Sequence, residues 1–312
     1  MGHKYFLIIN PAANSGKAER KYPKILRTLN KRGVDFDYRL TSQPGEAVRL
    51  AASVAKDDSL IVVAVGGDGT ICEVISGLFF RNENNPKPAL GILHIGTSPD
   101  FNKLHKIPVK IKDAINTLIK GKTKTIDIGK AAYNTSLVAG AEKKTSYFAS
   151  NVNIGLGPQI AQKANSRYRK YLGDFLGTLC AAINSLIGFK GMSLPISIDG
   201  KDTSFPLLIN LTVGKDPYLA SGMRALNPIA PDDGRLYVLS IKKTSLINIL
   251  SNIPKLYWGN ILDYNAAEIT YAKSLDIGIC SDYPQIEMDG DVKGFLPARI
   301  EVLAKALRII VP

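Results

Sequence analysis

Residues 61–78, IVVAVGGDGTICEVISGL, constrain the fold more than any other segment of this chain. The run from Ile61 to Val65 is apolar and mostly β-branched, which is typical of a strand buried on both faces of a parallel sheet. A glycine-rich stretch follows, and then Val74, Ile75 and Leu78 recur at helical spacing. The segment therefore predicts a strand, a tight turn and a helix in direct succession.

The predicted turn has the chemistry of a phosphate-binding site. Gly66, Gly67 and Gly69 lack Cβ atoms, so the main chain can adopt positive φ angles and approach a ligand closely. The helix that follows would present free N–H groups and the positive end of its dipole to an anion. A tight turn that binds no ligand is the simpler alternative, because glycine-rich turns between strands and helices are common.

Two common phosphate-binding motifs are excluded. Residues 11–18, PAANSGKA, have Pro11 and Ala18 where the Walker motif requires glycine and a hydroxyl residue. GGDGT does not match the dinucleotide motif GxGxxG either. Asp68 would repel a phosphate unless a metal ion or a transferable proton lay between them, so the turn indicates Mg²⁺ together with the phosphate.

Length and composition favour a soluble enzyme. A chain of 312 residues is long enough for two domains. Its three cysteines are far apart and form neither a metal motif nor a disulfide framework, which predicts a reducing cytosolic compartment. MGHKYFLIIN runs into a strand instead of a signal peptide. The longest uncharged apolar run, residues 175–189, is too short to span a bilayer.

The net charge of +13 predicts anionic partners. A positive field of this size attracts nucleotides, nucleic acid and anionic membranes alike. No zinc-finger, RRM or basic-zipper pattern is present, so nucleic acid is not expected as a partner. Attraction to a nucleotide or a membrane is favoured, and a basic surface without a partner remains the alternative.

Strands and helices alternate in residues 1–125, which predicts an α/β domain with a parallel sheet. The predicted strands are 4–10, 35–41, 61–65 and 89–96, and the predicted helices are 18–31, 45–55, the one after GGDGT, and 110–120. In such sheets ligands gather at the carboxyl ends of the strands. The turns NPAANSGK, TSQPGE, GGDGT and GTSPDF all occupy those ends, so one site is expected to collect them.

The pattern changes near residue 125. Residues 126–296 contain short β-like runs separated by turn residues, with one long helical insert from about Gln159 to Gly188. This density of strands predicts a second domain that is an antiparallel sandwich or barrel. Residues 297–312 are apolar and could return to pack on the first domain.

Taken together, the motifs resemble one family. NPAANSGKA, GGDGTICEVISGL, GTSPDF followed by KIP, DIG, PDDG and a late acidic DG motif have the order and spacing of the diacylglycerol kinase catalytic-domain family. That family includes bacterial lipid kinases and sphingosine kinases and is related to NAD kinases and phosphofructokinases. The resemblance implies a three-layer α/β domain with a parallel sheet, followed by a β-rich sandwich domain.

The resemblance also implies roles for individual residues. It places the nucleotide, ATP, at Asn10, Ser15, Gly16, Lys17, Thr41, Gly66, Gly67, Asp68, Gly69, Thr70, Glu73, Thr97 and Asp100. It places Mg²⁺ at Asp233 with the main-chain oxygens of Ala230 and Arg235, and assigns a metal role to Asp127 in DIG. Asp68 and Asp291 are the predicted catalytic residues. A carboxylate near the acceptor hydroxyl can take its proton during phosphoryl transfer, and Asp291 is the predicted general base.

Two positions depart from the family pattern. Asp291 stands where the family has Glu, which shortens the side chain by one methylene. Pro99 stands where the family has Asn, and proline lacks both a main-chain N–H and a side-chain amide. Both changes bear on activity and substrate choice, and Asp291 could instead be a hairpin residue.

The leading hypothesis is an ATP- and Mg²⁺-dependent lipid kinase at the inner, cytoplasmic face of a membrane. Its predicted docking residues are Lys163, Arg167, Arg169 and Lys170 beside the apolar segment 171–189. The acceptor would be diacylglycerol or a related lipid, and an apolar face or sheet edge could support a homodimer. The alternatives are a catalytically weakened member that binds nucleotide or lipid for regulation, and an enzyme similar to NAD kinases.

Overall fold

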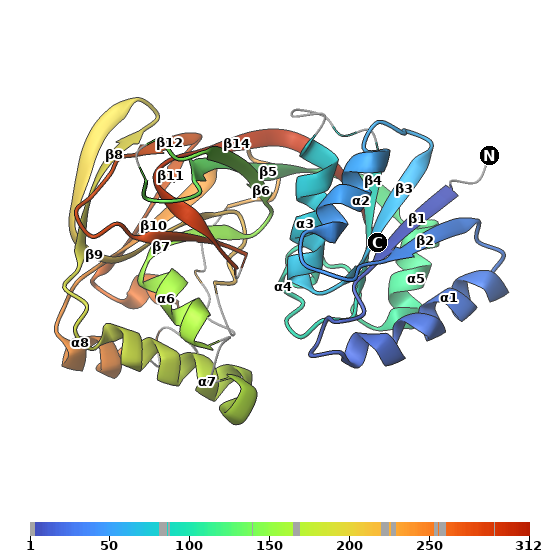
Figure 1. Ribbon diagram of the computed structural model, residues 1–312, viewed down its shortest axis with the longest axis horizontal. Helices are drawn as coiled ribbons and strands as arrows, with labels where there is room; N and C mark the ends of the chain where they lie inside the picture. Colours follow the sequence, from blue (N-terminus) through green and yellow to red (C-terminus); the bar gives the residue numbers. More distant parts are fainter. Residues whose placement is uncertain are drawn as a thin grey trace. The chain divides into compact units, whose positions relative to one another are not determined.

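The protein consists of two compact units (Figure 1). Unit 1 comprises residues 1–128 and 303–312, and unit 2 comprises residues 129–302. The computed structural model describes residues 4–80, 86, 88–138, 140–164, 169–219, 225, 229–252, 255, 260–289 and 291–312. Strands β5 (Lys122–Asn134) and β14 (Asp291–Val311) each contribute residues to both units.

Unit 1 is built from alternating strands and helices. Its other strands are β1 (Lys4–Ile9), β2 (Phe36–Leu40), β3 (Leu60–Gly66) and β4 (Ala89–His94). Its helices are η1 (Lys17–Arg20), α1 (Tyr22–Lys31), α2 (Glu46–Val54), α3 (Asp68–Phe80), α4 (Asp100–Leu104) and α5 (Ile111–Lys120). The apolar runs 61–65 and 89–94 become strands whose residues are almost all buried, as expected for strands covered on both faces.

The strands of unit 1 pair in parallel. β1 lies between β2 and β3, and β4 follows β3 on the other side. Ile309 of β14 pairs in parallel with Leu90 of β4, so the last residues of the chain extend the same sheet. Parallel pairing brings the carboxyl ends of β1, β2, β3 and β4 to one edge of the sheet.

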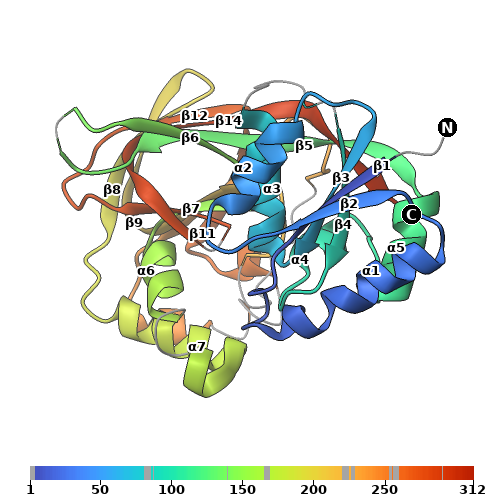
Figure 2. The ribbon, with the colours of Figure 1, turned by 45° about the vertical axis from the view of Figure 1, so that its right-hand side comes forward.

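Helices cover both faces of this sheet (Figure 2). On one face α1 and α5 pack through Ile25 and Ile115 against strand residues that include Leu7 and Val63. Because side chains alternate along a strand, the buried Ile8 faces the opposite side. There α3 packs against β3, and α2 packs against α3.

One predicted helix of unit 1 is interrupted. The helix expected over 18–31 is a short 3₁₀ turn followed by α1, with the break at Lys21. Pro23 lies in the first turn of α1, a position that proline tolerates because its missing N–H would have no helical partner there. The short helix α4 was not predicted, because five residues are too few to show a helical period.

Unit 2 is dominated by strands. They are β6 (Lys143–Phe148), β7 (Asn151–Gly155), β8 (Met192–Ile198), β9 (Lys201–Gly214), β10 (Leu236–Lys242), β11 (Ala267–Ala272), β12 (Ser274–Ile277) and β13 (Gln285–Met288), with parts of β5 and β14. The helices are α6 (Leu156–Lys163), α7 (Arg169–Leu186), α8 (Leu246–Ser251) and η3 (Ile261–Asp263). The expected mixed α/β fold with a β-rich C-terminal part is confirmed.

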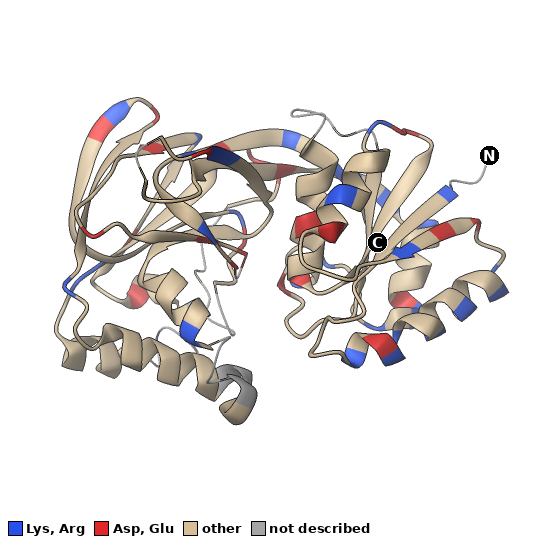
Figure 3. Ribbon diagram, viewed as in Figure 1, with Lys and Arg blue, Asp and Glu red and all other residues tan. Residues whose placement is uncertain are grey.

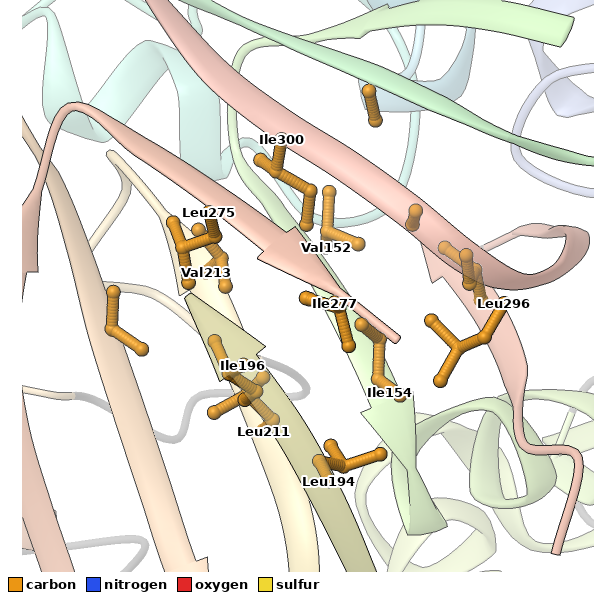
Figure 4. Packing of buried hydrophobic residues seen from close by; sticks show 14 of the residues in the cluster. Val152, Ile154, Leu194, Ile196, Leu211, Val213, Leu275, Ile277, Leu296 and Ile300 are labelled. Carbon is orange, nitrogen blue, oxygen red and sulfur yellow. The ribbon is translucent and has the colours of Figure 1, made fainter. Parts of the chain in front are cut away.

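The antiparallel pairings of unit 2 close into a ring. β9 pairs with β8, β8 with β12, β12 with β14, β14 with β13, β13 with β7, and β7 again with β9. The long strands β9 and β14 each pair with their two ring neighbours through different segments. Strands of this ring contribute Val152, Ile196, Leu211, Leu275 and Ile300 to the main core of unit 2 (Figure 4).

The helical insert of unit 2 is two helices, not one. α6 ends at Lys163 and α7 begins at Arg169, and within α7 Gly173 has a non-helical backbone with φ of 75°. α8 was not predicted from the sequence. It begins at the N-cap Ser245, whose hydroxyl accepts a hydrogen bond from the N–H of Asn248 (3.2 Å). No helix in the described part of the chain is long and apolar enough to cross a membrane.

The contact between α2 and α3 leads to a stability prediction. A Cβ added at Gly77 would lie 2.3 Å from the carbonyl oxygen of Val48 and 2.7 Å from Cβ of Ala51. Gly77→Ala should therefore force the helices apart and lower the free energy of unfolding by roughly 1–3 kcal/mol. Thermal or urea unfolding measures the change.

Gly69→Ala in the same helix is the matched control for this prediction. A Cβ at Gly69 would meet no atom within 4 Å. It should leave stability unchanged or raise it by up to about 1 kcal/mol, because alanine favours a helix over glycine. Equal stabilities of the two variants would contradict the packing proposed for α2 and α3.

Candidate functional site

The turn between β3 and α3 is tied to the turn after β4. The carbonyl oxygen of Gly66 accepts hydrogen bonds from the N–H groups of Ile95 (2.8 Å) and Gly96 (3.1 Å). The carbonyl oxygen of Gly67 accepts from the N–H groups of Thr70 (2.9 Å) and Ile71 (3.1 Å), which starts α3. These bonds fix both turns at the carboxyl edge of the sheet of unit 1.

Two glycines allow these turns to meet main chain against main chain. A Cβ at Gly96 would lie only 2.4 Å from Cα of Gly67. A Cβ at Gly69 would enter open space beside the first turn of α3. The result is an uncovered main chain at the start of a thirteen-residue helix, which suits an anionic ligand.

Asp68 lies within this turn, and only one of its two carboxylate oxygens accepts a hydrogen bond from the described residues. Its Oδ2 accepts the N–H of Asp100 (3.1 Å). Its Oδ1 is buried and has no hydrogen bond within the described residues, although Nε2 of His94 lies 3.5 Å away. Leaving a buried carboxylate oxygen unpaired is costly, so the geometry suits a bound cation or a proton donor at Oδ1.

His94 is a residue that the sequence analysis did not identify. Its side chain is 1% exposed, and Nε2 lies 3.1 Å from the carbonyl oxygen of Ser98 as well as near Asp68. The available signal was a single polar residue at the end of the apolar run ALGILH. A polar side chain at the carboxyl end of a buried strand lies where ligands bind in such sheets.

The first turn of the chain reaches the same place through Asn10. Its Nδ2 donates to Oγ1 of the buried Thr70 (3.1 Å), and its Oδ1 accepts the N–H of Ala12 (3.0 Å). Oγ1 of Thr97 donates to Oδ1 of Asn14 (3.4 Å). Three contacts, Asn10 to Thr70, Asp68 to Asp100 and Asn14 to Thr97, thus link the turns after β1, β3 and β4 in pairs.

The predicted residues 15–17 lie on the surface. Ser15, Gly16 and Lys17 are all exposed. Ser15 has a left-handed backbone with φ of 53°, and Gly16 has φ of 83°. Their placement leaves the hydroxyl group and the ammonium group accessible to a ligand.

Thr41 and Glu73 have structural contacts of their own. The N–H of Thr41 donates to the carbonyl oxygen of Ile9 (2.8 Å), which joins the end of β2 to β1. Oε1 of Glu73 accepts the N–H of Gly45 (3.0 Å) and so links α3 to the turn before α2. Glu73 therefore holds the second turn against α3.

The predicted metal ligands of the PDDG turn surround a lysine. Nζ of Lys215 lies 2.7 Å from the oxygen of Ala230, 2.8 Å from Oδ1 of Asp233 and 2.8 Å from the oxygen of Arg235. The Lys215 side chain is 2% exposed. These oxygens do not fit Mg²⁺ while the ammonium group lies among them. The described residues contain no cluster of three or more His, Cys, Asp or Glu side chains that could hold a metal.

The carboxyl group of Asp233 is held in its charged form. Burial raises its pKa, but the hydrogen bond and charge of Lys215, together with hydrogen bonds from Arg235, outweigh burial and leave the pKa below its ordinary value. Asp127, the other predicted metal residue, is buried in unit 1. Its Oδ1 accepts the N–H of Lys305 (2.8 Å), where β14 has a left-handed backbone.

Asp291 is the first residue of β14 and is paired with Met288 across a hairpin. Its side chain is 64% exposed and forms an ion pair with Lys293 (3.1 Å). Oδ1 of the neighbouring Asp289 accepts the N–H groups of Ser150 and Asn151, both at 3.2 Å. Asp289 thus ties the hairpin to the turn before β7, and Asp291 is the more exposed carboxylate of this motif.

A buried polar cluster lies across β13, β7 and β9. Nδ2 of Asn153 donates to Oε2 of Glu287 (2.6 Å), and Oδ1 of Asn153 accepts from Thr212 (2.7 Å) and Asn210 (3.3 Å). Glu287 is only 4% exposed. The sequence analysis missed this cluster, although an acidic residue between the apolar residues of QIEM was a usable signal.

Comparison with known proteins identifies both parts of the chain. Residues 4–131 match the model of the diacylglycerol kinase catalytic domain, and residues 150–311 match that of the YegS C-terminal NAD kinase beta sandwich-like domain. A diacylglycerol kinase of Staphylococcus haemolyticus is 27% identical over 310 residues, covering 98% of this chain and 87% of that protein. A diacylglycerol kinase of Staphylococcus saprophyticus is 26% identical over 310 residues, which cover 98% of this chain and 94% of that protein.

Solved structures agree with the fold. The crystal structure of a diacylglycerol kinase from Bacillus anthracis has a TM-score of 0.69 at 23% identity and covers 99% of this chain and 97% of its own. Yeast NADH kinase complexed with NADH has a TM-score of 0.54 at 13% identity, and the match covers 100% of this chain and 84% of the yeast chain. At these identities the likeness concerns the fold alone.

Proposed function

Because the chain belongs to the diacylglycerol kinase catalytic-domain family, as its motifs predicted, we propose that it transfers the γ-phosphate of ATP to a hydroxyl group of diacylglycerol or a related lipid. The observation that carries the proposal is the partly unpaired carboxylate of Asp68 beside an uncovered helix N-terminus. An acidic group in a phosphate-binding turn is useful when a cation accompanies the phosphates.

Asp68 and Asp100 are the proposed contacts to Mg²⁺ bound with ATP. The ion would neutralise charge that develops on the phosphates during transfer. The chain's own contribution is positioning. The N–H of Asp100 holds one oxygen of Asp68, while the main chain of Gly67 and Gly69 leaves room for phosphate oxygens. Asn10, Thr70 and Thr97 would fix the turns that surround the nucleotide.

Asp291 remains the proposed general base. Its exposure supports this role, because a base must be reachable by the acceptor hydroxyl. Glu287 is the other nearby acid of the same hairpin strand pair, but it is buried and bonded to Asn153.

We propose that the protein acts at a membrane surface. The side chains of Tyr171 and Ile187, in and after α7, are 75% and 65% exposed, and Ile247 of α8 is 81% exposed. From Leu176 to Leu186 α7 carries no charged residue (Figure 3). Exposed apolar side chains beside basic residues suit an interface with anionic lipid. We propose that this face lies on the inner, cytoplasmic side of a membrane.

The predicted basic docking residues are only partly described. Lys163 ends α6, and its Nζ lies 3.5 Å from the carbonyl oxygen of Asn184. Arg167 lies outside the described residues, and the side chains of Arg169 and Lys170 are not described. The apolar residues of α7 and α8 therefore carry the docking proposal.

Asp68→Asn tests the kinase proposal. The amide keeps the shape of the side chain but loses the charge, so phosphoryl transfer to diacylglycerol should fall to background even at saturating Mg²⁺. Transfer of labelled phosphate from ATP to a panel of lipids and to NAD measures the activity and its acceptor. Wild-type turnover by the Asp68→Asn variant would remove the role proposed for this turn.

Asp291→Asn should lower kcat by roughly 100-fold or more with little change in ATP affinity, because proton acceptance matters mainly in the transition state. Asp291→Glu should keep or raise activity, since it restores the longer side chain. Lipid kinase kinetics and ATP binding measure the two effects. A large loss in Glu287→Gln with normal turnover in Asp291→Asn would move the base to Glu287, and ATP binding without any lipid turnover would favour the regulatory alternative.

Binding to vesicles tests the membrane proposal. Sedimentation with anionic vesicles should weaken as salt is added, because the Debye length is about 8 Å at physiological ionic strength. The double variant Tyr171→Ser with Ile187→Ser should bind at least roughly tenfold more weakly, since burying each apolar side chain contributes about 1.5–3 kcal/mol. Leu137→Ser, at another exposed apolar residue of unit 2, is the control and should bind normally.

A further inference from the structure

Lys215 follows β9 directly and points into the turn that precedes β10. Gly214 at the end of β9 pairs with Tyr237 of β10, and the N–H of Lys215 donates to the carbonyl oxygen of Ser150 (2.9 Å). These main-chain bonds hold the base of the side chain in place. Its ammonium group then reaches the oxygens of Ala230, Asp233 and Arg235.

The contact distances are those of an ammonium group. Nζ has three N–H donors, and the three oxygens lie at 2.7, 2.8 and 2.8 Å, which is the range of charge-assisted hydrogen bonds. Mg²⁺ requires oxygens at about 2.0–2.1 Å in near-octahedral geometry. The turn therefore presents a set of oxygens suited to a cation, and the ammonium group of Lys215 is the cation that they bind.

Asp233 is fully engaged by this arrangement. Oδ1 accepts from Lys215 and from the N–H of Arg235 (3.1 Å), and Oδ2 accepts from the Arg235 guanidinium (3.1 Å). That guanidinium also lies over the ring of Tyr271, 5.1 Å from its centre. A metal ion could occupy the place between the oxygens of Ala230, Asp233 and Arg235 only by displacing a buried ammonium group, which would then lose its hydrogen bonds at a large cost.

We propose that the ammonium group of Lys215 takes the place of the Mg²⁺ ion predicted for the PDDG turn, so that unit 2 is stabilised at this turn without a bound metal. The substitution is local to unit 2 and leaves any Mg²⁺ bound with ATP at Asp68 unaffected. It makes the turn independent of the concentration of free metal. The inference does not depend on the substrate of the proposed kinase.

Thermal unfolding of the full chain, without nucleotide, tests the first part of this proposal. Lys215→Met should lower the Tm by about 6–20 °C, because removing one partner of a buried ion pair leaves the other uncompensated. Lys242→Met is the matched control, since Lys242 pairs with Glu268 at a similar 3.1 Å but is 51% exposed. It should change the Tm by no more than a few degrees. Equal Tm values for the two variants would overturn the proposal.

Metal binding tests the second part. Lys215→Ala removes the ammonium group and opens space beside the three oxygens, so this variant should bind one more Mn²⁺ ion per chain than the wild type in an electron paramagnetic resonance titration. Addition of Asp233→Asn should remove the additional ion. The same Mn²⁺ stoichiometry in the wild type and Lys215→Ala, or a wild-type ion that Asp233→Asn removes, would overturn the proposal. Neither measurement uses catalysis, so failure of the kinase proposal would leave both results interpretable.

Discussion

The carbonyl oxygen of Gly66 is the point on which the candidate site of unit 1 depends. It accepts the N–H groups of Ile95 and Gly96, and so fixes the turn after β3 against the turn after β4. The pairing is feasible only because Gly67 and Gly96 have no side chains at their contact. The position of Asp68, its bond to the N–H of Asp100 and the open start of α3 all follow from this approach of two main chains.

The sequence predicted those features of the site that depend on residues close together along the chain. A buried strand, three glycines and a helical period define the turn at residues 66–70 without tertiary information. Parallel strands explain why Asn10 meets Thr70 and Asn14 meets Thr97 at the same edge of the sheet. The predicted ends of the helices were less accurate. The break at Lys21 and the division of the 159–188 insert depend on local backbone geometry, such as the positive φ of Gly173, that the apolar period does not reveal.

Contacts between distant residues could not be predicted in this way. Lys215 carries no local motif, and only the pairing of β9 with β10 brings it to the PDDG turn. Likewise Glu287 and Asn153 are 134 positions apart and meet through the register of β13 and β7. The same motif residue can therefore serve different chemistry, since Asp233 matches the family pattern while its partner here is an ammonium group.

The strand β14 has a consequence for the order in which the protein can fold. Unit 1 takes its last strand segment, residues 303–312, from beyond the whole of unit 2, and Asp127 depends on the N–H of Lys305 for a hydrogen bond. During synthesis, β4 must therefore wait for its neighbour while about 200 further residues leave the ribosome. Until then one edge of the apolar strand β4 has no neighbouring strand, and the sheet of unit 1 is complete only after Ile309 has been synthesised.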